Sequence, residues 1–246
     1  MTFALPDARW QDPALLIPRK TPVGPVAINW ANPITRGLRT ALPMRREYGL
    51  KSLIDDPIFP NGWVFNETNT FYKLDGVEFN GGNECVRSVD AVDIDAVRPQ
   101  GTSLGIFTPT RSSVDPSYYY FFYSNNFQNH AFYSGGTTSP LSWFVHGNQI
   151  TTIPSYHQHP TGVPAVVAGN WDYTNDVHKL FYNEYSVTSA QVESTSADFY
   201  CIGGRDDATA RYSNSICQFF FQWDRVLTDA EHIALARDPY QLVMPV

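Results

Sequence analysis

The chain has no long apolar run and few charged residues. Only 17% of its 246 residues are Asp, Glu, Lys or Arg, and 15% are aromatic, which is typical of a compact globular protein and not of a disordered one. No apolar stretch approaches the roughly 20 residues that cross a bilayer, and the first residues lack the basic and apolar regions of a secretory signal. We therefore expect synthesis in the cytoplasm and no membrane insertion.

Cysteine is also scarce. Cys85, Cys201 and Cys217 cannot all pair within one chain, and none lies in a C-x-x-C spacing. We expect buried free thiols in strands. One pair could still form a disulfide if the molecule meets an oxidising medium after assembly.

The chain lacks the clustered positive charge of a nucleic-acid-binding protein. Residues 1–60 carry eight Lys/Arg and five Asp/Glu, whereas residues 61–246 carry nine and nineteen, so the first segment is at +3 and the remainder at −10. Binding to phosphates needs clustered Lys and Arg that displace counterions. We therefore expect no free nucleic-acid partner.

Motifs for catalysis are missing as well. A glycosidase needs two carboxylates roughly 5 to 10 Å apart across a cleft, and the nearest approximations here are Asp93, Asp95 and Glu78. The sequence contains no G-x-S-x-G serine motif and no Walker loop. The sequence thus predicts that the protein is not an enzyme and that it needs no cofactor.

Short apolar or alternating runs, separated by Gly, Asn, Ser and Pro, make up most of the chain after residue 60. They recur at the spacing of an antiparallel sandwich or barrel, and no helical pattern lies between them. In the last run Cys217, Phe219, Phe221 and Trp223 fall on one face at period two, while Gln218 and Gln222 fall on the other. This alternation predicts a strand with one buried side.

A single convincing helix follows that strand. Thr228 and Glu231 have the spacing of a capping box, and Asp238-Pro239 should end the helix. We expect a helix of about three turns over residues 228–237.

The first 60 residues have a different composition. Nine of the eighteen prolines lie there, which disfavours continuous helix or central strand. The segment nevertheless contains Trp10, Leu16 and Trp30, which a solvated linker would not carry. We predict two parts, an extended proline-rich arm over 1–60 and a sandwich domain over 61–246. Trp10, Leu16, Trp30 and Arg36 are the residues of the arm that we expect to bind a partner subunit or a neighbouring copy.

Two stretches resemble the laminin-G-like, concanavalin A-like jelly rolls of bacteriophage proteins. In that family the last core strand ends in W-x-R-x-L-S/T-x-A-E-I and is followed by N/D-P-(W/Y)-Q-L. Here the matching residues are Trp223 to Glu231 and Asp238-Pro-Tyr-Gln-Leu242, with a similar lead-in from Lys20 to Leu38. The resemblance implies an all-β, antiparallel two-sheet jelly-roll sandwich and membership of a phage virion.

Sugar binding would need exposed aromatic faces beside amide or carboxylate groups. Two stretches supply both, and the candidate residues are Tyr119, Tyr123, Asn125, Asn126, Trp171 and Tyr173. A Ca²⁺ ion at a loop rim is a further candidate ligand, with Asp206, Asp207 or Asp172, Asn175 and Asp176 as donors.

These observations lead to one functional expectation with one alternative. We expect a non-enzymatic virion protein, either a capsid decoration protein or a fibre or tail accessory. It would be anchored to other virion proteins by its arm, assembled as a homo-oligomer, and able to bind host-surface glycans. The alternative is a free carbohydrate-binding or glycan-hydrolysing protein of the same fold.

Overall fold

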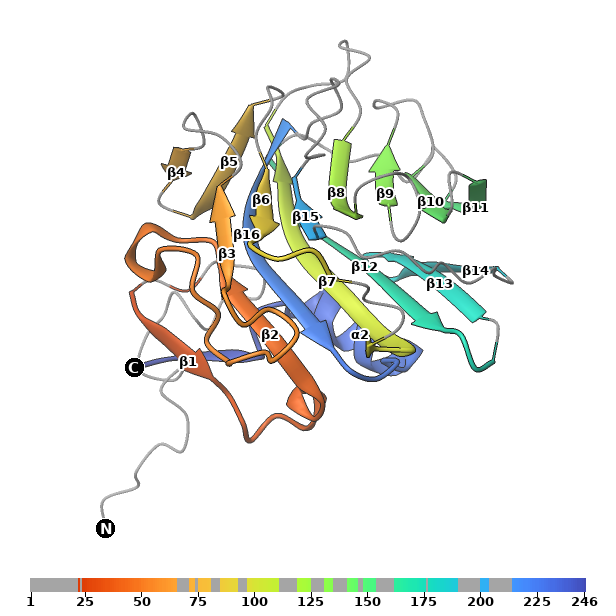
Figure 1. The fold of residues 1–246 in the computed structure, drawn as a ribbon, viewed down its shortest axis with the longest axis horizontal. Coiled ribbons are helices and arrows are strands. Elements are labelled where there is room, and N and C mark those ends of the chain that lie inside the picture. The colour runs from red at the N-terminus through yellow and green to blue at the C-terminus, as the bar shows by residue number, and fades with distance from the viewer. Residues whose placement is uncertain are drawn as a thin grey trace.

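A computed structural model describes residues 22, 24–65, 71–73, 75–80, 85–92, 97–110, 119–124, 131–134, 141–145, 148–153, 162–175, 177–189, 200–203 and 214–246. Most of these residues form two antiparallel sheets (Figure 1). The seven-stranded sheet has the order β11 (Asn148–Ile153), β10 (Leu141–Val145), β9 (Ala131–Ser134), β8 (Tyr119–Ser124), β15 (Tyr200–Ile202), β6 (Val86–Ser88) and β3 (Trp63–Phe65).

The second sheet is eight-stranded. Along it lie β14 (Tyr185–Ser189), β13 (Val177–Tyr182), β12 (Ala165–Asp172), β7 (Gln100–Pro109), β16 (Asn214–Trp223), β5 (Gly76–Asn80) and β4 (Phe71–Lys73), and β2 (Leu38–Pro43) pairs with β16. The prediction of an all-β antiparallel two-sheet sandwich is confirmed.

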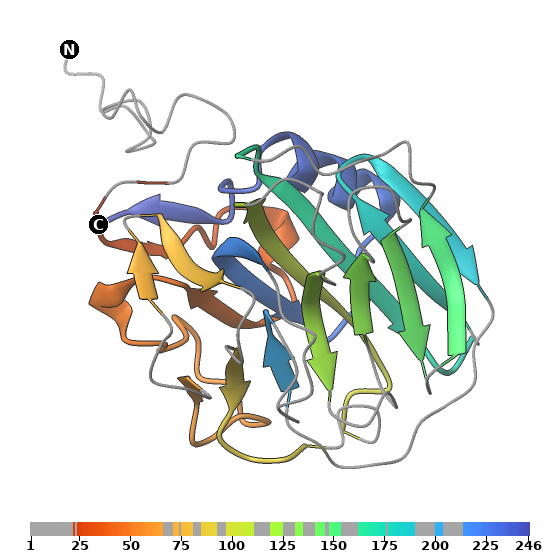
Figure 2. The same ribbon diagram turned by 90° about the horizontal axis from the view of Figure 1, so that it is seen from above.

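Both faces of the eight-stranded sheet are buried, so the molecule has a third layer. Phe107, Trp171 and Phe220 belong to the core between the two sheets. On the opposite face, Ile106 and Phe221 are covered by α2 (Asp229–Arg237) and by the pair formed by β1 (Val26–Ile28) and β17 (Val243–Pro245). Figure 2 shows the sheets as separate layers, with α2 on the outer side of the second sheet.

The third layer corrects our expectation for β16. Phe219, Phe221 and Trp223 do share the outer face, but Cys217 belongs to the inner core with Phe220. The register against β7 shifts between Cys217 and Phe219, and a bulge of this kind moves the residues before it to the other face. Gln222 and Gln218 are also buried, so the strand has two buried sides.

The buried glutamines are satisfied by other polar side chains. Gln222 Oε1 accepts from Arg98 Nη1 at 2.7 Å, and Arg98 Nη2 forms an ion pair of 3.0 Å with Asp56 Oδ2. Gln218 Oε1 accepts from the hydroxyl of Tyr240 at 2.5 Å. These pairs explain how polar groups are tolerated inside the fold, since a buried polar group without a partner is costly.

The predicted helix is confirmed as α2. The Thr228 side chain accepts from the backbone N–H of Glu231, and the Glu231 side chain accepts from the backbone N–H of Thr228, which is the expected capping box. His232, on the buried side of α2, stacks on Phe181 with ring centroids 3.5 Å apart. Its Nε2 lies 3.0 Å from Oδ1 of Asn170, so Nε2 carries the proton of the neutral ring.

The predicted arm differs most from the structure. Residues 1–20 lie outside the described residues, but β1 pairs with β17 and β2 pairs with β16 of the same chain. Leu38 and Leu42 are buried in the two cores. Residues 26–60 therefore belong to the sandwich, because their apolar side chains are buried within the chain itself instead of on a partner. The boundary predicted at residue 60 falls inside the folded unit.

Two smaller expectations also have an outcome. Cys85, Cys201 and Cys217 are all free and buried, as expected; Cys201 and Cys217 lie in the strands β15 and β16, whereas Cys85 directly precedes β6. Among the described residues, no helix has the length and apolar character needed to cross a membrane.

Candidate functional site

An open groove lies where the N-terminal strands meet the C-terminal ones. Its volume is about 460 Å³, and we call it the Trp30 groove. It is formed by the turn after β1, the 3₁₀ helix η2 (Pro33–Thr35), the start of β2 and one residue of the following loop. The lining residues are Trp30, Asn32, Pro33, Thr35, Arg36, Gly37, Leu38, Arg39 and Ile54.

Trp30 is the most conspicuous side chain of the groove. It is 63% exposed, whereas most of the aromatic side chains that the structure describes are buried. Its turn is fixed by hydrogen bonds from the backbone N–H of Trp30 to Ile28 O and of Asn29 to Leu242 O. The indole is therefore presented to solvent on a rigid support. An exposed aromatic face beside polar groups is a common feature of sugar-binding sites.

The charged side chains that line the groove are both arginines. Arg36 is exposed, and Arg39 is 51% exposed while it forms an ion pair of 2.5 Å with Asp224 Oδ2. The lining residues include no Asp or Glu, and the only carboxylate in this ion pair is that of Asp224. The groove is thus locally positive in a chain whose net charge is −7.

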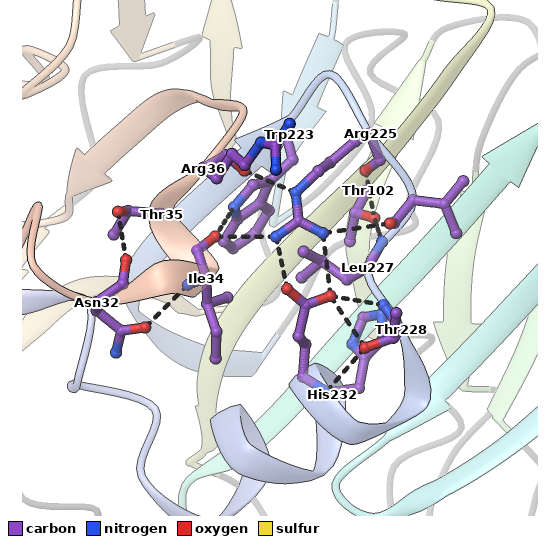
Figure 3. Close-up of polar contacts among 12 residues, drawn as sticks. Asn32, Ile34, Thr35, Arg36, Thr102, Trp223, Arg225, Leu227, Thr228 and His232 are labelled. Atoms are coloured by element: carbon purple, nitrogen blue, oxygen red, sulfur yellow. Dashed lines mark hydrogen bonds and ion pairs between the residues drawn. The ribbon is translucent and has the colours of Figure 1, made fainter.

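One arginine from β16's end holds the wall of the groove in place. Arg225 Nε donates to Arg36 O at 2.7 Å, and Arg225 Nη2 donates to Ile34 O at 3.3 Å (Figure 3). The indole Nε1 of Trp223 also donates to Ile34 O, at 2.8 Å. The other side of the Arg225 guanidinium binds Glu231 of α2 through two contacts, of 2.6 and 3.0 Å. We call these five residues the Arg225 clasp.

The electrostatics of the clasp favour its charged form. Partial burial acts to raise the pKa of Glu231, but hydrogen bonds from Arg225 and Thr228 outweigh it and lower the pKa to about 2. Glu231 is therefore ionised at neutral pH and serves both the helix cap and the clasp.

Asn32 and Gly37 complete the local support. Asn32 Nδ2 donates to Oε1 of Gln241 at 3.0 Å, and Gln241 Nε2 in turn donates to the carbonyl of Ala234 at the end of α2. Gly37 has φ +78°, and a Cβ there would lie 2.7 Å from Asp224 Oδ1. The positive φ favours glycine at this position, and any other residue would also force the Asp224 carboxylate to shift.

Segments from the N-terminal and C-terminal parts of the chain thus meet at this site. Residues 29–38 are bonded to Trp223, Arg225 and Gln241 by the contacts above.

The predicted glycan-binding set is not assembled. Trp171 is only 1% exposed and donates from Nε1 to the carbonyl of Arg98, so its prediction as a sugar-binding residue is wrong. It lies on the face of β12 that forms the inner core. Tyr173 is half-buried, packs against that core and lies with its ring 5.4 Å from His178. Tyr119 and Tyr123 lie on β8, where the structure describes the backbone. Asn125 and Asn126 lie outside the described residues.

Part of the predicted arm set is brought together. Trp30 and Arg36 both line the groove. The prolines and apolar residues around them in the sequence do not predict this groove. Trp10 and Leu16 lie outside the described residues. Their binding to a partner stays a prediction.

The other candidates have structural partners or fall outside the structure. Glu78 forms an ion pair of 3.0 Å with Lys73, and Asp172 accepts hydrogen bonds from the backbone and side chain of Asn175. Asp93, Asp95, Asp176, Asp206 and Asp207 lie outside the described residues. In the part of the chain that the structure describes, no group of three or more His, Cys, Asp or Glu side chains is placed to hold a metal ion.

Comparison with known proteins gives matches only at the level of the fold. No protein-family model matches the chain, and neither does any curated protein sequence. Among solved structures, Trypanosoma rangeli sialidase in complex with sialic acid matches with 12% identity and a TM-score of 0.63, covering 88% of this chain and 35% of that one. A mutant of the same sialidase displaying trans-sialidase activity matches with 10% identity and a TM-score of 0.64, covering 85% and 34%.

A bacterial toxin shares the fold as well. The receptor binding domain of botulinum neurotoxin mosaic serotype C/D matches with 8% identity and a TM-score of 0.60, covering 82% of this chain and 51% of that one. The chain thus spans about a third to a half of the length of these proteins. At such identities the likeness shows a shared β-sandwich.

The expectation that this protein is not an enzyme is contradicted by the first of these comparisons. Several matching structures are sialidases, so the fold occurs in enzymes. The missing carboxylate motif was too narrow a criterion, because it tested for one arrangement of catalytic groups only.

Proposed function

We propose that this protein is a carbohydrate-binding β-sandwich module, and that the Trp30 groove is its binding site. The observation that carries the proposal is an indole that is 63% exposed on a rigid turn, beside the exposed guanidinium of Arg36. Sugar rings present C–H groups that stack on such a face, and their hydroxyls bind neighbouring polar groups.

The rigidity of the groove supports this proposal. The backbone of Ile34 and Arg36 is held by Trp223 and Arg225, so little order has to be created when a ligand binds. A preorganised site loses less conformational entropy on binding, which matters for weakly bound, hydrated ligands such as sugars. The fold likeness agrees with the proposal, since the sialidase structure holds sialic acid and the toxin domain is named for receptor binding.

We also propose that the module works as part of a phage virion. This proposal rests on the resemblance of residues 20–38, 223–231 and 238–242 to phage jelly rolls.

A glycan array probed with the full-length chain tests the binding function. Replacing Trp30→Ala should weaken binding to the glycans retained by the wild type by about tenfold, which corresponds to about 1.4 kcal/mol. Trp30→Phe should keep part of the affinity because it keeps an aromatic face. Tyr185→Ala is the matched control, since Tyr185 is 52% exposed on β14 and lies outside the groove.

Two outcomes would contradict the proposal. One is an array without any retained glycan. The other is a retained glycan whose affinity, measured by calorimetry, is the same for wild type and Trp30→Ala.

A further inference from the structure

We infer that the Trp30 groove selects sugars that carry a carboxylate, with Arg36 as the group that binds it. The inference rests on the proposed function, and it adds the chemical class of the ligand. The lining of the groove has two guanidinium groups and no carboxylate. An anionic ligand is the natural counterpart of such a lining.

Arg36 and Arg39 have different roles in this site. The Arg39 guanidinium is engaged by Asp224, with Nε and Nη2 at 2.6 and 2.5 Å from Oδ2. A ligand carboxylate would have to compete with Asp224 for it. The guanidinium of Arg36 has no ion-pair partner among the described residues, so it is the group left to bind an incoming anion.

Arg36 lines the same groove as Trp30, and its main chain is held by hydrogen bonds. Arg36 follows η2 directly, its N–H donates to Pro33 O at 3.2 Å, and its carbonyl accepts from Arg225. The main chain is therefore fixed while the side chain remains exposed. A planar guanidinium binds a carboxylate through two parallel hydrogen bonds, which adds orientation as well as affinity.

The remaining polar groups of the groove are committed to the protein. Asn32 donates to Gln241 and accepts from the backbone of Ile34, and the Thr35 hydroxyl donates to Asn32 O at 2.6 Å. The lining thus offers few free donors for sugar hydroxyls. Selectivity must therefore come from stacking of the sugar ring on Trp30 and from the charge of Arg36.

Other anions fit the groove less well. Nucleic acids need an extended basic surface that contacts several phosphates, whereas this groove has two arginines in a chain of net charge −7. An acidic peptide such as polyglutamate would meet the same guanidinium but has no ring to stack on the indole. A single carboxylate on a sugar ring uses both features.

The test compares acidic glycans with their own neutral derivatives. Glycans retained on the array are measured by calorimetry before and after chemical reduction of their carboxylates, together with 3′-sialyllactose against lactose and a polyglutamate peptide. We expect carboxyl reduction to weaken binding by about tenfold or more. Arg36→Gln should lose a similar factor for the acidic glycan and nothing for the reduced one. Arg46→Gln is the matched control, since Arg46 is exposed in the 3₁₀ helix η3 (Arg46–Tyr48), outside the groove.

The outcomes separate this inference from the proposed function. If the retained glycans are neutral and Trp30→Ala abolishes their binding, the binding function stands and the inference is wrong. If acidic glycans bind Arg36→Gln as tightly as wild type, or if polyglutamate binds as tightly as they do, the inference is also wrong. If no glycan binds at all, the proposed function itself is lost.

Discussion

The substitution Arg225→Lys should destabilise the fold more than the same substitution at an exposed arginine. The guanidinium joins the carbonyls of Ile34 and Arg36 to the carboxylate of Glu231, with the shortest contact at 2.6 Å. A lysine keeps the charge, but one ammonium group cannot reach all three partners. One charge-assisted contact and one carbonyl contact should be lost, which costs about 2 kcal/mol in the free energy of unfolding.

Urea unfolding followed by tryptophan fluorescence measures this change, and the melting temperature should fall by about 4 to 8 °C. Arg237→Lys is the control, because Arg237 and its partner Glu184 have side chains that are 68% and 43% exposed. The control should stay within about 0.5 kcal/mol of wild type. Equal stability of the two variants would refute the role that we assign to the clasp. Because the clasp holds the groove, Arg225→Lys should also weaken glycan binding.

Two further predictions concern acid stability and assembly. Burial lowers the pKa of His232 to about 3. The carboxylates of Asp229 and Glu231 act to raise this pKa, but their effect is smaller. The unfolded chain, with a histidine pKa of about 6.5, binds more protons between these values, so stability falls as the pH falls below about 6.5. Wild type should lose about 2 kcal/mol more than His232→Gln between pH 7 and pH 5 in urea unfolding, and parallel pH profiles would contradict this. For assembly, mass spectrometry of purified phage particles should detect the protein. A chain without residues 1–20 should fold but be depleted from the particles. If the truncated and the wild-type chain are present in equal copy number, that segment has no anchoring role.

Some of the fold could be predicted because it depends on local rules. The helix over 229–237 follows from the capping box of Thr228 and Glu231 and from the stop at Pro239, all within one segment. The strands follow from alternation and turn residues. The burial of Cys201 and Cys217 follows from the apolar strands in which they lie.

The wrong predictions share one cause. Nine prolines in residues 1–60 indicated an arm, yet β2 pairs with β16 and buries Leu42, because a strand at the margin of a sheet tolerates Pro43 at its end. Trp171 was taken for a sugar-binding residue, because a sequence does not tell which face of a strand lies against a second sheet. Both errors concern contacts between segments that are far apart in the chain.

The amino-acid sequence by itself determined the all-β class and the C-terminal helix, since these depend on spacing and composition within short windows. Only the tertiary structure decided the third layer, the bulge that turns Cys217 inward, the groove shared by Trp30 and Arg36, and the hydrogen bond from Arg225 to Arg36. Arg225 lies 189 residues from Arg36, and no local pattern encodes a hydrogen bond across that separation. The contacts of Arg225 depend on how the two sheets pack, and that packing depends on residues throughout the chain.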